Sequence, residues 1–301
     1  MTAPVRWLLL GAGGMLGRDL REVLAADAAV ELTAATRAEV DVTDPHAVRA
    51  AVPGHQLVVN AAAWTDVDAA EAEPERALAA NGEAVGRLAQ VCHASGARLL
   101  HLSTDYVFAG DATAPYLEDS PTAPVNRYGE SKLRGEQLVR AALPADGYVI
   151  RTAWLYGEHG RNFVATMLRL ARERDSVDVV RDQRGQPTWS MALARQLVRL
   201  GHAALAGQAP AGVYHGTAAG ETTWYDFARD VFALAGLDPN RVRPTTSDRF
   251  VRPARRPAYS VLSHGRWAVA GLTPMAPWRD MLAEALARPG FADLVRAAQT
   301  G

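Results

Sequence analysis

Apolar runs of strand length alternate with stretches of helical spacing along the first half of the chain. The runs occupy residues 7–10, 30–33, 56–60, 98–103 and 148–151. They are short and continuous, which is typical of strands buried on both faces. This order of strands and helices predicts an α/β fold with a parallel sheet covered by helices on both sides.

The stretches between these runs carry apolar residues three or four positions apart. This spacing predicts helices over residues 45–51, 75–95 and 126–142, and a further helix over residues 162–174. Right-handed crossovers between parallel strands make the first half a doubly wound, Rossmann-type domain. Such domains bind ligands at the carboxyl ends of their strands, so we expect the functional residues there.

Length and composition exclude several classes of protein. The chain has 301 residues, of which 49% are hydrophobic and 22% charged, and its formal net charge is -1. This charge predicts no attraction to nucleic acid or to an anionic membrane surface. No apolar stretch reaches the roughly 18 residues of a membrane-spanning helix, and the first residues do not resemble a signal peptide. A single cysteine, Cys92, excludes an intramolecular disulfide, so we expect a cytoplasmic protein.

A glycine-rich turn follows the first predicted strand directly. Residues 11–17 read Gly-Ala-Gly-Gly-Met-Leu-Gly and lead into a helix. Strand, glycine-rich turn and helix form the context of a dinucleotide-binding fingerprint, in which the backbone approaches a pyrophosphate at the helix N-terminus. An ordinary strand-to-helix turn is the alternative interpretation. The predicted cofactor contacts here are Gly11, Gly13, Gly14, Met15, Leu16 and Gly17.

The end of the second predicted strand bears on the choice of cofactor. NAD-specific sites commonly place an acid there for the ribose 2′-hydroxyl, whereas an arginine suits the 2′-phosphate of NADP. Here Thr36 is followed by Arg37, and the first acids are Glu39 and Asp41. We therefore predict NADPH and leave the use of NADH open. The alternative is that Arg37 is only a solvated surface charge.

Tyr128 and Lys132 lie four residues apart in a predicted helix, which places both side chains on one face. A tyrosine has a pKa of about 10, and a nearby positive charge lowers that pKa, which favours proton donation near neutral pH. The pair alone is weak evidence, because such pairs are common on helix surfaces. Thr104 ends a predicted strand and adds a hydroxyl with a chemical role, whereas Asp41 and Asp119 are also explained as turn or cap residues.

Several motifs together make the chain resemble a known family. Besides the glycine turn and residues 128–132, they lie at residues 60–71, 103–108, 151–157, 162–163, 182–188, 212–215 and 253–257. The chain resembles the dTDP-4-dehydrorhamnose reductases, which are extended short-chain dehydrogenases/reductases. The motifs span nearly the whole chain in the expected order, and residues 60–71, residues 182–188 and the Arg255-Arg256 pair are particular to this family.

The resemblance implies a reaction and the residues that carry it. Hydride from NAD(P)H would reduce the C4 ketone of dTDP-4-dehydro-L-rhamnose to give dTDP-L-rhamnose. Tyr128 would be the general acid, and Lys132 would stabilise its phenolate and bind the nicotinamide ribose. Thr104 would hold the carbonyl oxygen, and Asp105 would be a substrate or proton-network residue.

The resemblance also implies further binding residues and a division of the chain. The cofactor would contact Asp41, Val42, Asn60, Ala61, Ala62 and Ala63 besides the residues named above. The dTDP-ketosugar would contact Thr65, Val67, Asp68, Trp154, Asn162, Arg255 and Arg256, together with Thr104 and Asp105. Residues 1–150 would form the NAD(P)-binding domain. Residues 151–301 would form mainly a smaller, interleaved substrate-binding lobe, with segments that return to the main sheet.

Other functions of the same fold stay open. A related dTDP-4-ketosugar of an antibiotic pathway, such as a dihydrostreptose precursor, needs nearly the same chemistry. A non-catalytic NADP-binding regulatory subunit and an extended epimerase are further alternatives, although intact Thr104, Tyr128 and Lys132 argue against the regulatory subunit. Some family members form metal-linked dimers through acidic residues, but residues 189–193 contain no carboxylate. We therefore predict no metal site and a monomer or weak homodimer.

Overall fold

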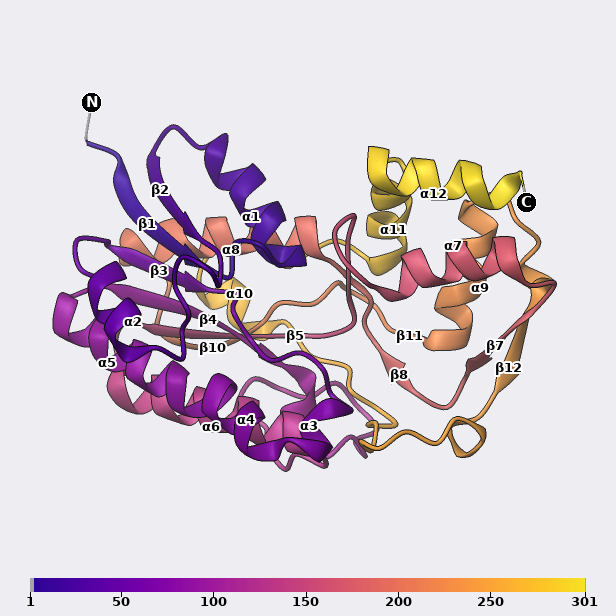
Figure 1. The fold of residues 1–301 in the computed structure, drawn as a ribbon, viewed down its shortest axis with the longest axis horizontal. Helices are drawn as coiled ribbons and strands as arrows, with labels where there is room; N and C mark the ends of the chain where they lie inside the picture. Colours follow the sequence, from indigo (N-terminus) through magenta and orange to yellow (C-terminus); the bar gives the residue numbers. More distant parts are fainter. Residues whose placement is uncertain (1–2, 301) are drawn as a thin grey trace.

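A six-stranded parallel sheet is the centre of the computed structural model, which describes residues 3–300 (Figure 1). Its strands stand in the order β10-β5-β4-β3-β1-β2. They are β1 (Val5–Leu10), β2 (Val30–Ala35), β3 (Leu57–Asn60), β4 (Arg98–Thr104), β5 (Gly147–Thr152) and β10 (Gly212–His215). All but β10 lie where the apolar runs predict strands, so the predicted Rossmann-type fold is confirmed.

Helices cover both faces of this sheet. One face carries α1 (Met15–Ala25) and α8 (Ser190–Leu205), and the other carries α2 (Pro45–Ala51), α5 (Ala84–Ser95) and α6 (Arg127–Ala142). Successive residues of β1 alternate between the two cores: Trp7 and Leu9 pack toward α1 and α8, and Leu8 and Leu10 pack toward α5. Burial on both faces explains why these strands read as continuous apolar runs.

The helix predicted over residues 75–95 consists of three pieces. A short helix, α4 (Pro74–Leu78), gives way to a π-helical segment, Ala79–Glu83, and then to α5. The π-helical segment carries Asn81, whose amide bonds both backbone groups of Trp64. Such wide turns often occur at functional sites. This one directs a polar side chain toward the loop after β3, which regular helical spacing does not predict.

Most of the remaining elements belong to the second half of the chain. The helices are α3 (Ala69–Ala72), α7 (Phe163–Glu173), α9 (Trp224–Leu234), α10 (Gly265–Val269), α11 (Trp278–Leu286) and α12 (Pro289–Gln299). Three pairs of short strands are β6 (Leu155–Tyr156) with β9 (Thr188–Trp189), β7 (Val177–Val180) with β12 (Val242–Thr245), and β8 (Arg184–Gly185) with β11 (Thr222–Thr223). Across residues 3–300, no helix has both the length and the apolar character needed to cross a membrane.

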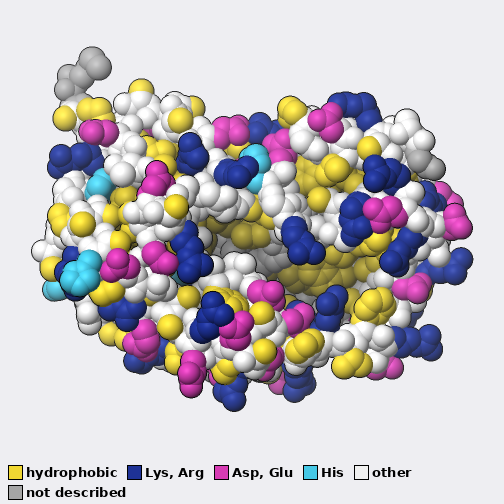
Figure 2. All heavy atoms as spheres, viewed as in Figure 1, with side chains coloured by type: hydrophobic (Ala, Val, Ile, Leu, Met, Phe, Trp, Pro, Cys, Tyr) yellow, Lys and Arg dark blue, Asp and Glu magenta, His cyan; other side chains and the backbone are white. Residues whose placement is uncertain are grey.

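The two halves of the molecule face each other across a hollow. Figure 1 shows α7, α9 and α12 on the right, apart from the sheet, whereas β10 and α8 return from the same half of the chain to the sheet. Figure 2 shows the hollow between the two parts, with apolar side chains on its floor and Lys or Arg side chains along its rim. The carboxyl ends of the sheet strands face this side, so residues beyond those ends are in position to bind a ligand.

Candidate active site

The carboxyl ends of neighbouring strands bring the predicted residues together. In the sheet register, Asn60 of β3 lies beside Leu10 of β1 and His101 of β4. Thr104, at the end of β4, lies beside Thr152 of β5. The strand order reverses between β1 and β3, and doubly wound sheets bind ligands at such a switch point. The loops after β1, β3 and β4 therefore belong to one site.

The glycine turn after β1 fits a pyrophosphate. Gly11 has a φ of 80°, and a Cβ there would lie 2.6 Å from the backbone of the loop after β3, while a Cβ on Gly17 would lie 2.1 Å from the Gly11 oxygen. These two glycines are required by the protein's own packing. A Cβ on Gly13 or Gly14 would meet no atom closer than 3.4 Å, so that side of the turn is open. Since α1 begins with no side-chain cap, its first N–H groups are available to phosphate oxygens.

Arg37 and Asp41 lie together beyond the end of β2. The Arg37 side chain is 85% exposed, and its Nε is 3.2 Å from Asp41 Oδ2. Asp41 also accepts bonds from the backbone nitrogen and hydroxyl of Thr43, at 2.9 and 2.7 Å. These bonds lower the pKa of Asp41, and Arg37 adds to the shift. Val42 is buried beside them. The predicted contacts of these residues with the adenosine end of the cofactor stay predictions.

Two buried asparagines hold the loop after β3. The Asn60 amide nitrogen is 3.2 Å from Nδ1 of His101, and its oxygen accepts from Ala62 N, also at 3.2 Å. Asn81 bonds the nitrogen and oxygen of Trp64 at 2.9 and 3.0 Å and the Ser131 hydroxyl at 3.0 Å. This loop is thereby fixed against α6. Among its predicted contact residues, Ala63 and Thr65 are exposed, and Ala61, Ala62 and Val67 are half-buried.

The start of α6 is fixed on both sides. Asn126 caps the helix by accepting from Gly129 N at 2.8 Å, and its amide nitrogen donates to the Arg255 oxygen at 2.9 Å. A Cβ on Gly129 would lie 2.2 Å from the Tyr106 oxygen, so the helix packs directly on the turn after β4. Tyr128 and Lys132, which belong to this helix as predicted, are thereby carried to the end of β4.

Lys132 is held beneath the site. It is 2% exposed, and its Nζ donates to the Leu102 oxygen at 2.6 Å. Burial lowers the pKa of Lys132 to about 8, and the charge of Glu136 opposes this shift. Because an ammonium has three donors and Leu102 uses one, two remain for other partners.

Tyr128 differs from the prediction in one respect. The sequence predicts that the neighbouring lysine lowers its pKa, but burial and the charge of Asp105 raise the pKa of this phenol, with Thr104 opposing the rise. The physical reason is that the surroundings remove water from the phenolate, while the Lys132 ammonium is engaged with the Leu102 oxygen. The phenol is therefore protonated at neutral pH.

Thr104 and Asp105 form a bonded pair beside Tyr128. The Thr104 hydroxyl donates to Asp105 Oδ1 at 3.0 Å and accepts from Tyr106 N at 3.2 Å. Asp105 is 2% exposed, and burial raises its pKa to about 6, against bonds from Ser260 and Thr104. The site thus holds a hydroxyl, a protonated phenol and a carboxyl group that titrates near neutrality.

A buried ion pair behind these groups is absent from the sequence predictions. Arg151 of β5 donates to Glu136 of α6 at 2.7 and 3.0 Å, and the Ser103 hydroxyl donates to the same carboxylate at 2.5 Å. Glu136 follows Lys132 by one helical turn, so its charge also acts on that lysine. The spacing of Lys132 and Glu136 was the available signal, but nothing local identifies Arg151 as the partner.

The predicted substrate-binding residues of the second half differ in whether their side chains are already bonded within the protein. Arg256 is bonded to Asp68 at 2.9 and 3.0 Å, whereas the neighbouring Arg255 is exposed. The side-chain oxygen of Asn162 caps α7 by accepting a hydrogen bond from a backbone nitrogen of that helix at 3.0 Å. The side-chain nitrogen of Asn162 donates to the Gly157 oxygen at 2.7 Å. Trp154 has a φ of 48° and stacks on Trp224 with ring centroids 3.6 Å apart. The role of each in substrate binding stays a prediction.

Comparison with known proteins gives consistent matches. The family model described as the RmlD substrate binding domain matches residues 5–290. A dTDP-4-dehydrorhamnose reductase of Streptomyces griseus is 56% identical over 281 residues, which cover 93% of this chain and 92% of the relative. A dTDP-4-keto-6-deoxy-D-glucose reductase of Streptomyces niveus is 50% identical, with 93% and 96% covered. The crystal structure of a Bacillus anthracis dTDP-4-dehydrorhamnose reductase in complex with NADP has a TM-score of 0.87 and 35% identity, with 94% of this chain and 99% of that chain covered.

Proposed function

We propose that this chain, which belongs to the RmlD substrate binding domain family, is an NADPH-dependent reductase that converts dTDP-4-dehydro-L-rhamnose into dTDP-L-rhamnose. The observation that carries the proposal is the gathering of Thr104, Tyr128 and Lys132 at the end of β4, in a chain 56% identical to a reductase of that name. The NADP held by the Bacillus anthracis protein supports the choice of cofactor.

Each residue of the site has its own role in reducing a ketone. Bound NADPH supplies the hydride that forms the new C4–H bond. As the carbonyl π bond breaks, negative charge develops on its oxygen. The Thr104 hydroxyl holds that oxygen by a hydrogen bond once its proton turns from Asp105 Oδ1 to the substrate. Tyr128 gives its proton to that oxygen, which completes the hydroxyl of the product. The raised pKa of Tyr128 supports this role, because it keeps the donor protonated until charge develops on the substrate.

Lys132 lowers the cost of the phenolate that Tyr128 leaves. With a pKa of about 8, the ammonium is mostly charged at pH 7. Its bond to the Leu102 oxygen fixes its position, and its two remaining donors are free for the phenolate and the nicotinamide ribose. The neighbouring carboxyl of Asp105, with a pKa of about 6, is mostly ionised at pH 7 and accepts the hydrogen bond of the Thr104 hydroxyl until the substrate oxygen takes that bond over.

In this proposal Arg255 binds the diphosphate of the substrate. Arginine suits phosphate because its guanidinium donates two parallel hydrogen bonds. Arg256 already gives such a pair of bonds to Asp68, while Arg255 is exposed and its backbone is held by Asn126. The stacked rings of Trp154 and Trp224 offer an apolar surface to the sugar or the base.

The test is consumption of NADPH with dTDP-4-dehydro-L-rhamnose made in situ from dTDP-glucose by a 4,6-dehydratase and a 3,5-epimerase. Rapid oxidation with dTDP-L-rhamnose as the product supports the proposal. Leaving out the epimerase supplies dTDP-4-keto-6-deoxy-D-glucose, the substrate named for the 50% identical relative, which is the second candidate. Oxidation that does not need the epimerase favours that candidate, and no oxidation in either reaction overturns both.

A further inference from the structure

A carboxylate of the chain itself occupies the hydrogen-bond donors at the end of β2. Oε2 of Glu39 accepts from the backbone nitrogen of Thr36 at 2.7 Å and from the Thr36 hydroxyl at 2.8 Å. The same short turn is closed by bonds from Glu39 N and Val40 N to the Thr36 oxygen, at 3.1 and 2.9 Å. Thr36 thus offers two donors that converge on one anionic oxygen.

This carboxylate lies beside the glycine turn. A Cβ on Gly13 would have the Thr36 methyl carbon as its nearest neighbour, at 3.6 Å, and Ala12 N donates to the Ala35 oxygen at 3.0 Å. Arg18 Nε donates to the Gly13 oxygen at 3.2 Å. The donors of Thr36 therefore adjoin the part of the turn that is open toward a cofactor.

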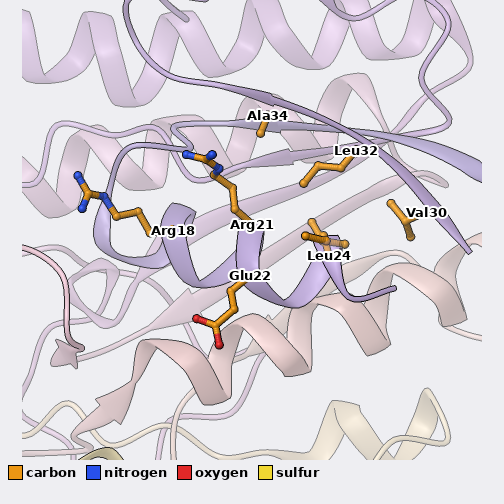
Figure 3. A pocket seen from close by; sticks show the side chains of 8 residues that line it. Arg18, Arg21, Glu22, Leu24, Val30, Leu32 and Ala34 are labelled. Atoms are coloured by element: carbon orange, nitrogen blue, oxygen red, sulfur yellow. The ribbon is translucent and has the colours of Figure 1, made fainter. Parts of the chain in front are cut away.

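Two arginines of α1 place positive charge on the same side. Arg18 and Arg21 line a hollow of about 630 Å³ between α1 and β2, together with Ala34. Figure 3 shows Arg21 rising from α1 toward the strand that carries Ala34, Arg18 nearer the start of the helix, and Glu22 pointing the opposite way. The bonds from Thr36 lower the pKa of Glu39, and the charge of Arg21 adds to this shift, so the carboxylate is ionised at neutral pH.

We propose that Glu39 sets the preference between NADH and NADPH by competing with the 2′-phosphate for the donors of Thr36. A ribose 2′-hydroxyl can donate to the Glu39 carboxylate without disturbing it. A 2′-phosphate is an anion that needs donors, so it displaces Glu39 from Thr36 and gains the charges of Arg18 and Arg21. Since Glu39 is exposed, its carboxylate can turn into water when it is displaced. This inference rests on the proposed function, because it assumes a dinucleotide at the glycine turn.

The test measures binding of two cofactor fragments by calorimetry, without ketosugar. Adenosine 2′,5′-bisphosphate carries the 2′-phosphate, and ADP has the 2′-hydroxyl. Glu39→Gln removes the negative charge, and Glu31→Gln is the matched control on an exposed glutamate of β2. We expect Glu39→Gln to shift the ratio of the two dissociation constants about tenfold in favour of the bisphosphate, which corresponds to the loss of one competing charge contact. Glu31→Gln should leave the ratio within about twofold.

Arg21 gives an independent arm of the same experiment. Arg21→Gln should weaken the bisphosphate several-fold more than ADP, and added salt should reduce that difference. An unchanged ratio of the two dissociation constants in Glu39→Gln would overturn the inference. An equal loss of affinity for both fragments in Arg21→Gln would also overturn it. If the wild type binds neither fragment, the inference and the proposed function both fail. If it binds both fragments but reduces no ketosugar, only the proposed function fails, and the ratio in Glu39→Gln still decides the role of Glu39.

Discussion

Arg256 and Asp68 meet in a two-point ion pair, with nitrogen–oxygen distances of 2.9 and 3.0 Å. They are 188 residues apart in the chain, Asp68 just before α3 and Arg256 in the loop that precedes α10. The same loop gives the Arg255 oxygen to the side chain of Asn126, which caps the helix of Tyr128. The pair therefore ties a loop of the second half to the half that carries the proton donor.

Substitutions of the two arginines of this loop should have different effects, one on substrate binding and one on stability. Arg255→Ala removes an exposed cation and should raise KM for the dTDP-sugar about tenfold with little change in kcat, because the diphosphate is bound equally before and during reaction. Arg256→Ala removes the two-point pair and leaves Asp68 only the Ala254 nitrogen at 3.2 Å and Arg252 at 3.8 Å, so it should lower the free energy of unfolding by about 1–2 kcal/mol. Steady-state kinetics and urea unfolding of both variants check this division, and the reverse pattern would contradict it.

Tyr128→Phe should remove the proton donor and keep the ring. We expect kcat to fall by about two to four orders of magnitude, while the dissociation constant of NADPH, measured by fluorescence titration, stays within about twofold. Tyr106→Phe is the control, since its ring packs edge-on against Tyr128 with centroids 6.0 Å apart and should tolerate the loss of its hydroxyl. Turnover that survives in Tyr128→Phe would refute the assignment of the general acid.

Asp105 should make stability depend on pH. Its pKa in the folded protein is about 6, above the roughly 3.9 of a free aspartate, so between these values the folded state binds more protons than the unfolded state. The contribution of Asp105 to stability therefore falls as pH rises from about 4 to 6. Asp105→Asn should be more stable than the wild type by about 1–3 kcal/mol at pH 7, and this gain should shrink toward pH 4. Urea unfolding of both proteins at pH 7 and pH 4 tests this prediction. An equal gain in stability at the two pH values would contradict a raised pKa of Asp105.

Substitutions of two glycines of the turn should distinguish a role in packing from a role in cofactor binding. Gly17→Ala places a Cβ 2.1 Å from the Gly11 oxygen and should prevent a stable fold. Gly13→Ala meets no atom closer than 3.6 Å, so the protein should fold with a nearly unchanged Tm and lose about tenfold in NADPH affinity. Thermal unfolding and calorimetry check both variants. Equal affinity in Gly13→Ala would place the pyrophosphate elsewhere.

The sequence predicts those features of the fold that short stretches determine. The apolar run of β1, the glycines after it and the spacing of Tyr128 and Lys132 depend on neighbours within one turn or strand, and the structure places them as expected. Contacts between distant segments were not predictable in this way. The pairing of Arg151 with Glu136 depends on how whole elements pack. The family resemblance implies that segments of the second half return to the sheet, but no apolar run marked β10 as one of them.

The pKa of Tyr128 shows the same limit in the site itself. The lysine one turn away predicts a lowered pKa, but burial by surrounding segments determines the actual direction. The π-helical turn at Asn81 is a second example, because the apolar spacing of residues 75–95 fits an uninterrupted helix. In both cases the tertiary environment outweighs the local pattern.

Transfer of a label from the cofactor to the sugar tests the central claim most directly. The reaction would be run with NADPH deuterated at C4 of the nicotinamide, on each of its two faces in turn, with the dTDP-ketosugar as the acceptor. The proposed function predicts dTDP-L-rhamnose with one deuterium at sugar C4 from one face of the cofactor and none from the other. A product without deuterium, or with deuterium at another carbon, would contradict it.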